Sequence, residues 1–127
     1  MAARTFDQLL SAYPASVQAV AGSARRLIFE LLPNAEETVD RTGPYVAYGY
    51  GPGYKGVVCT LILSKQGVKL GLSRGAELAD RRKLLAGTGK IHRYIPLMKP
   101  DDVRQPGVRP LLRSAAASWR ERRRQEA

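Results

Sequence analysis

The sequence predicts an α+β domain with an antiparallel sheet of about five strands, flanked by N- and C-terminal helices. Two segments, one near each end of the chain, carry apolar residues at the spacings of three and four that amphipathic helices show. Between them, short apolar runs are separated by glycine and proline, as in strands joined by tight turns. Such closely spaced strands favour antiparallel pairing, and the terminal helices can cover one face of the sheet.

The N-terminal part of the chain predicts two helices. A short first helix, capped by Thr5 or Asp7, is expected to end near Ala12. The second is expected over residues 16–32, where one face collects Val17, Val20, Ala21, Ala24, Leu27, Ile28 and Leu31. Proline lacks a backbone donor and disfavours helical geometry in the residue before it, so Pro33 ends this helix.

The middle of the chain predicts four strands. Residues 37–42 and 45–50 form short strands on either side of a glycine-proline turn. Residues 57–64 are rich in β-branched side chains and apolar on both faces, so this strand is expected at the centre of the sheet. A tight turn leads into an alternating strand over residues 68–73, which makes this pair the clearest hairpin in the chain.

The C-terminal half predicts a helix over residues 76–85 and a fifth strand over residues 91–97. After a loop, a final helix carries on one face Val108, Leu111, Leu112, Ala115 and Trp119. We expect one domain over residues 1–127, with its core at about 15–118 and a basic tail at 119–127, of which residues 120–127 are frayed and solvated.

The positive charge of the chain lies in its C-terminal half. The 127 residues carry a net charge of +10. Residues 1–64 contain five Lys/Arg and five Asp/Glu, whereas residues 65–127 contain sixteen and six. This one-sided charge favours an anionic partner, such as nucleic acid or a phosphorylated metabolite, although a soluble arginine-rich protein without such a partner would show the same excess.

The cysteine count and the apolar runs bear on location. Cys59 is the single cysteine, so no intramolecular disulfide or multi-cysteine zinc site is expected, and a reducing cytoplasm suits the chain. Its place in the most apolar strand predicts a buried, unreactive thiol. Residues 1–6 do not resemble a secretory signal, and the run 57–63 is too short to span a bilayer. We expect a cytoplasmic monomer or small homo-oligomer that needs no cofactor.

A glycine-rich basic segment is the strongest candidate for a binding site. Gly87-Thr88-Gly89-Lys90 resembles part of a phosphate loop, but it follows a predicted helix and lacks the flanking glycine and hydroxyl residue that nucleotide hydrolysis requires. Glycine amides and basic side chains can still hold an anion, which gives as candidate residues Lys69, Gly87, Gly89, Lys90, His92 and Arg93. A glycine turn with exposed basic neighbours explains the same pattern.

Other residues leave alternatives open. Glu36, Glu37 and Asp40 could bind a hard cation, or they could be the charges of an exposed edge strand. His92 could act as acid or base in an enzyme for a small anionic substrate, but no spaced nucleophile and base accompany it. Four tyrosines near a glycine-rich stretch could be stacking platforms or ordinary sheet residues: Tyr45, Tyr48, Tyr50 and Tyr54.

Two sequence blocks, LLPNAEET at residues 31–38 and LLAGTGKIHRYI at residues 84–95, resemble the YdhG-like family of small bacterial domains of unknown function. The similarity spans about residues 15–117. It implies a compact α+β fold with an antiparallel sheet flanked by helices, and no established reaction. Some relatives are described as frataxin-like iron chaperones, which would imply iron binding through the acidic residues named above. The excess of positive charge in this chain opposes such a role.

The function that the sequence predicts is therefore binding of an anionic ligand or partner through a basic face, without catalysis. Iron binding and an enzyme for a small anionic substrate are the alternatives.

Overall fold

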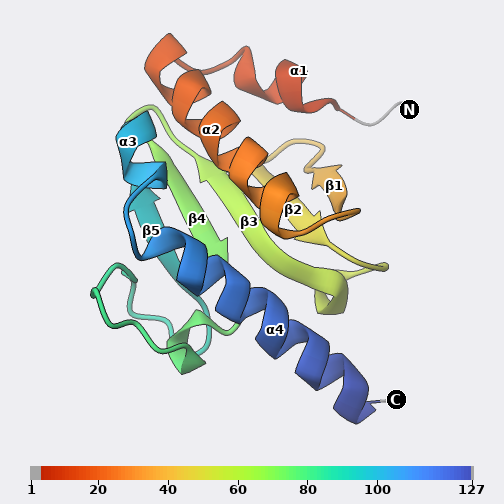
Figure 1. The fold of residues 1–127 in the computed structure, drawn as a ribbon. Helices are drawn as coiled ribbons and strands as arrows, with labels where there is room; N and C mark the ends of the chain where they lie inside the picture. Colours follow the sequence, from red (N-terminus) through yellow and green to blue (C-terminus); the bar gives the residue numbers. More distant parts are fainter. Residues whose placement is uncertain (1–3, 127) are drawn as a thin grey trace.

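The computed structural model describes residues 4–126 and confirms the predicted α+β fold (Figure 1). Five strands form one antiparallel sheet: β1 (Glu36–Val39), β2 (Tyr45–Gly49), β3 (Val57–Leu63), β4 (Val68–Leu72) and β5 (Arg93–Leu97). Their spatial order is the sequence order, so each strand pairs with the next along the chain. The most apolar strand, β3, is central, as predicted.

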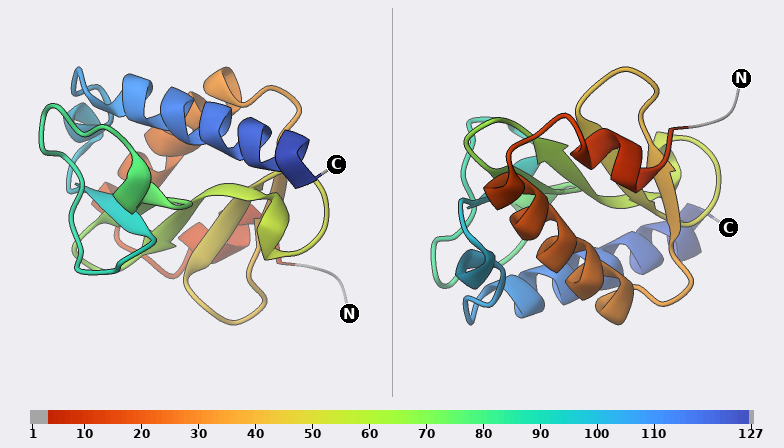
Figure 2. Two further views of the ribbon diagram at one scale, coloured as in Figure 1. Left: turned by 90° about the horizontal axis from the view of Figure 1, so that it is seen from below. Right: turned by 90° about the horizontal axis from the view of Figure 1, so that it is seen from above.

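The helices are α1 (Phe6–Leu10), α2 (Ala15–Leu31), α3 (Pro100–Val103) and α4 (Val108–Glu126). The two long helices, α2 and α4, cover one face of the sheet. Figure 1 shows α2 and α4 on the same side of the strands, and the view from below in Figure 2 shows α4 lying over them. Of the two predicted caps for α1, Thr5 makes the contacts, since its hydroxyl accepts from the Gln8 N–H at 3.1 Å.

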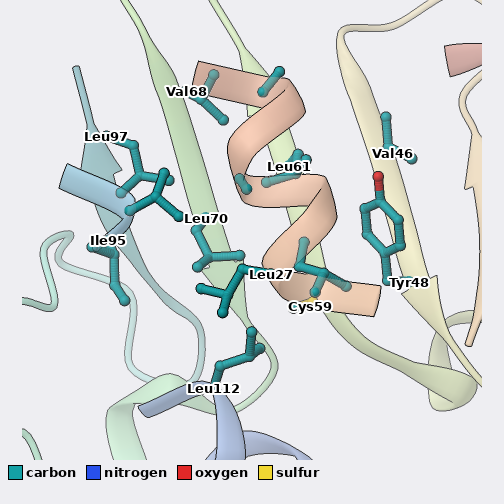
Figure 3. Packing of buried hydrophobic residues seen from close by; sticks show 14 of the residues in the cluster. Leu27, Val46, Tyr48, Cys59, Leu61, Val68, Leu70, Ile95, Leu97 and Leu112 are labelled. Carbon is teal, nitrogen blue, oxygen red and sulfur yellow. The ribbon is translucent and has the colours of Figure 1, made fainter. Parts of the chain in front are cut away.

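The core lies between the helices and the covered face of the sheet (Figure 3). Leu27 of α2 and Leu112 of α4 meet Leu61 and Leu70 from the central strands, and all four side chains are buried. Burying a leucine side chain contributes about 1.5–3 kcal/mol, so this layer supplies much of the stability. Cys59 is also fully buried, as predicted.

The predicted helix over residues 76–85 is wrong. The segment contains a single 3-10 turn, Gly75–Glu77, followed by turns and extended backbone. The Asp80 carboxylate accepts from the N–H groups of Leu84 at 2.8 Å and Leu85 at 2.9 Å, and Lys83 has a left-handed φ of 58°. An aspartate side chain that accepts from nearby backbone N–H groups replaces the hydrogen bonds of a helix, so Leu84 and Leu85 belong to an ordered loop.

The predicted fraying of the C-terminal tail is also wrong, since α4 continues to Glu126. The indole N–H of Trp119 donates to the Lys55 carbonyl at 2.8 Å, and its ring lies 5.3 Å from that of Tyr50. These contacts attach the last turns to the β2–β3 connection. The short helix α3 lies where a loop was expected; Asp102, at its start, accepts from the Met98 N–H at 2.7 Å.

Candidate functional site

The face of the sheet opposite the helices carries two rows of side chains. The strand register places in one cross-strand row Thr38, Ala47, Thr60, Gly71 and Tyr94. The neighbouring row contains Tyr45, Ile62, Lys69 and Pro96. The first row is low at its centre because Gly71 has no side chain and its neighbours are short. The second row and the ring of Tyr94 stand higher.

This difference in height produces a hollow of about 380 Å³, which we call the sheet hollow. Gly71 and Thr60 form its floor, and Ile62, Tyr94 and Tyr54 contribute to its walls. All its lining residues are apolar, hydroxyl-bearing, glycine or basic. Its volume lies within the range of about 300–1,000 Å³ that small-molecule sites occupy.

Two basic residues, His92 and Arg93, line the hollow. Nδ1 of His92 accepts from the Arg74 N–H at 3.0 Å, so the proton of the neutral imidazole is on Nε2, where it can be donated to a ligand. Strand pairing places Arg93 in the row of the buried Leu72, one position from Tyr94, and its Nε donates to the Gly89 carbonyl at 2.5 Å. Outside the lining, Lys69 Nζ lies 4.6 Å from the centre of the Tyr94 ring.

The predicted anion-binding residues therefore divide into three groups. Lys69, His92 and Arg93 lie in or beside the sheet hollow. Gly87 has a φ of 102°, and a side chain there would meet the Tyr94 ring at 3.1 Å; a side chain at Gly89 would meet the His92 carbonyl at 2.7 Å. These glycines shape the turn that places Tyr94 and Arg93. Lys90 is exposed on that turn and lines neither the sheet hollow nor the neighbouring hollow beside α4.

Sequence reasoning missed Gly71 and Tyr94. A glycine inside a strand marks a position where the sheet surface is open or another group comes close, which was the available signal. Their proximity follows from the register of β4 with β5, where Gly71 pairs with Tyr94.

A second hollow of about 280 Å³, which we call the helix trough, adjoins the first. Both are lined by Tyr54, Val57, Ser73 and His92. The remaining walls include basic and aromatic side chains from α4 and two loops: Lys55, Arg74, Trp119, Arg122 and Arg123. Glu126 is the acidic residue in this lining.

The carboxylates proposed for a metal do not form a site. Alternation along β1 places Glu36 on the open face, whereas Glu37 accepts from Arg25 at 2.6 and 2.9 Å and from the Tyr48 hydroxyl at 2.8 Å. Burial and this carboxylate raise the pKa of Tyr48. Asp40 accepts from the Gly43 N–H at 2.5 Å. Within residues 4–126, no group of three His, Cys, Asp or Glu side chains could hold a metal, so the structure does not bring these carboxylates together as a metal site.

The burial of Cys59 predicts a slow reaction with thiol reagents. Its side chain is 0% exposed, and burial raises the pKa of the thiol, so little reactive thiolate forms at neutral pH. We expect Ellman's reagent to leave the native protein unmodified for hours and to label one thiol at once in guanidinium chloride. Rapid labelling of the native protein would contradict the packing around β3.

Comparisons of the chain with family models, curated proteins and solved structures give no match. The resemblance to YdhG-like domains stays a prediction from the sequence. Among the helices of residues 4–126, none has the length and apolar character needed to cross a membrane.

Proposed function

We propose that this domain binds a small organic anion in the sheet hollow. The observation that carries the proposal is an apolar floor around Gly71 bordered by the basic residues His92 and Arg93, without a carboxylate in the lining. A flat apolar group fits against Gly71 and Tyr94, and the anionic group lies at the end of the hollow that His92 and Arg93 line. Charged hydrogen bonds of this kind are worth about 1.5–3 kcal/mol.

The hydrogen bonds that Ser73 and His92 already make favour binding without catalysis. The Ser73 hydroxyl donates to the Val57 carbonyl at 2.8 Å, so it is not paired with a base that would make it a nucleophile. His92 uses Nδ1 to accept from the Arg74 backbone. The remaining His92 N–H and the arginine are donors, which suit recognition of an anion.

The proposal is tested with two fluorescent dyes that share their rings. Anilinonaphthalene sulfonate is an aromatic anion, and N-phenyl-naphthylamine is the same ring system without the sulfonate. We expect the anionic dye to bind the protein more tightly, and Arg93→Gln to weaken the anionic dye by about tenfold, as loss of about 1.4 kcal/mol requires. The neutral dye should change by less than about twofold.

A matched control is Arg26→Gln, which removes the same charge from an exposed position on α2, far from this face. It should leave both dyes unchanged. Equal weakening of both dyes by Arg93→Gln, or equal effects of the two variants on the anionic dye, would contradict a specific anion site. So would a stable dimer that Ile62→Asp dissociates and whose formation excludes the dye, because the hollow would then be a contact between copies.

A further inference from the structure

We infer that the C-terminal end of α4 supplies a phosphate-binding extension of this site, and that the ligand is a phosphorylated aromatic compound of the mononucleotide type. The inference rests on the proposed function, since the helix trough extends the sheet hollow. Its motivation is that the end of α4 contributes Arg122 and Arg123 to the lining of the trough, which adjoins the sheet hollow.

The basic end of α4 is held in place. Trp119 is fixed by its hydrogen bond to the Lys55 carbonyl at 2.8 Å and by its contact with Tyr50. The Arg123 guanidinium lies 5.8 Å from the centre of the Trp119 ring, and Arg122 donates to the Ser118 hydroxyl at 2.9 Å. The guanidinium groups are thus positioned before a ligand arrives, which lowers the entropic cost of binding.

The charge of the trough suits more than one phosphate. Arg122 and Arg123 share it with Lys55 and Arg74. Two of these cations have carboxylate partners, Arg74 with Glu77 at 2.6 Å and Arg123 with Glu126 at 3.3 Å. These pairs have side chains that are about half exposed, and exposed pairs contribute only about 0–1 kcal/mol, so a phosphate can compete for the arginines. The planar guanidinium matches phosphate oxygens in a bidentate manner.

The two hollows adjoin, so one ligand of suitable length could occupy both. Tyr54, Ser73 and His92 line both, and Tyr54 is 84% exposed at their junction. An exposed tyrosine beside basic groups offers a stacking surface for a base, worth about 1–3 kcal/mol in nucleic-acid binding proteins. The geometry therefore places an aromatic ring in the sheet hollow and the phosphates in the trough.

The test uses mant-ADP fluorescence with the full chain and two double variants. Arg122→Gln with Arg123→Gln removes two trough arginines, whereas Arg120→Gln with Arg124→Gln removes two exposed arginines from the same turns that do not line the trough. Glutamine preserves helix propensity, and both variants lose the same charge. We expect the first pair to weaken mant-ADP binding at least about tenfold and the second less than about twofold.

Competition identifies the ligand class and separates the two proposals. ADP should displace mant-ADP better than adenosine or pyrophosphate alone, and anilinonaphthalene sulfonate should bind both double variants equally. Equal weakening by the two double variants would overturn the inference, because the loss of binding would then follow the net charge of the protein and not contacts in the trough. Tighter binding of a short oligo-dT would also overturn it. If the sulfonate dye binds and mant-ADP does not, the phosphate extension fails alone; if neither binds, the proposed function fails with it.

Discussion

Replacing Leu61 with alanine is expected to lower the free energy of unfolding by about 3 kcal/mol, because the substitution removes buried methyl groups and leaves a cavity. Leu61 is 0% exposed and lies on the central strand, facing the helices. Its neighbours on the two adjacent strands, Val46 and Leu70, are held by strand pairing and cannot collapse into the space. Urea unfolding measures the change as a lower midpoint with an unchanged slope.

The matched control is Ile62→Ala, one residue along the same strand. Ile62 faces the sheet hollow and is only partly buried, so we expect a loss of about 1 kcal/mol or less. The control should change dye binding, which Leu61→Ala should affect only through unfolding. Equal costs for the two substitutions would contradict the assignment of the two faces.

Replacing Gly49 with alanine is expected to destabilise the protein by about 3 kcal/mol or more, because the backbone of β2 has no space for a side chain there. A Cβ at Gly49 would collide with the Gly56 carbonyl oxygen and would lie 2.9 Å from the Val57 Cα. The same carbonyl accepts from the Tyr50 N–H at 2.8 Å, at the irregularity between Tyr48 and Gly49 where the register shifts. A side chain at this position could fit only if β2 moved away from the start of β3. Thermal unfolding measures the loss.

Gly22→Ala serves as the control for this substitution. Gly22 is inside α2, and the nearest atom to an added Cβ is Arg26 Nη1 at 3.7 Å, an ordinary contact. Alanine is favoured over glycine in a helix by about 0.5–1 kcal/mol, so this variant should be more stable than the natural chain. A stable, fully folded Gly49→Ala protein would show that the β2–β3 contact is looser than described.

Much of the fold was predictable because its signals are local. Residues 16–32 carry a helical period, and observed α2 spans Ala15–Leu31. The run from Val57 carries β-branched residues and is the central strand. The helix expected over residues 76–85 failed because the Asp80 carboxylate bonds the backbone of Leu84 and Leu85, and apolar spacing does not report that competition.

The candidate site was predictable only in part. His92 and Arg93 were singled out because they are basic residues near glycines, and they do line the sheet hollow. Tyr94, beside them in the chain, and Gly71 were not, since each looks like an ordinary strand residue until the register of β4 and β5 makes them partners. Arg122 and Arg123, which line the trough, were predicted to lie in a frayed tail. The hydrogen bond from Trp119 to the Lys55 carbonyl, which holds this end of α4, joins residues far apart in sequence and leaves no local signal.

By itself the sequence determined the α+β class, most of the helices and strands, the antiparallel order and the excess of positive charge at the C-terminal end, because propensity, periodicity and charge are properties of neighbouring residues. Tertiary structure alone decided that Glu37 pairs with Arg25, that the sheet is hollow above Gly71 and that the arginines of α4 lie beside that hollow. Each of these depends on strand register and helix packing, which bring together residues from distant parts of the chain.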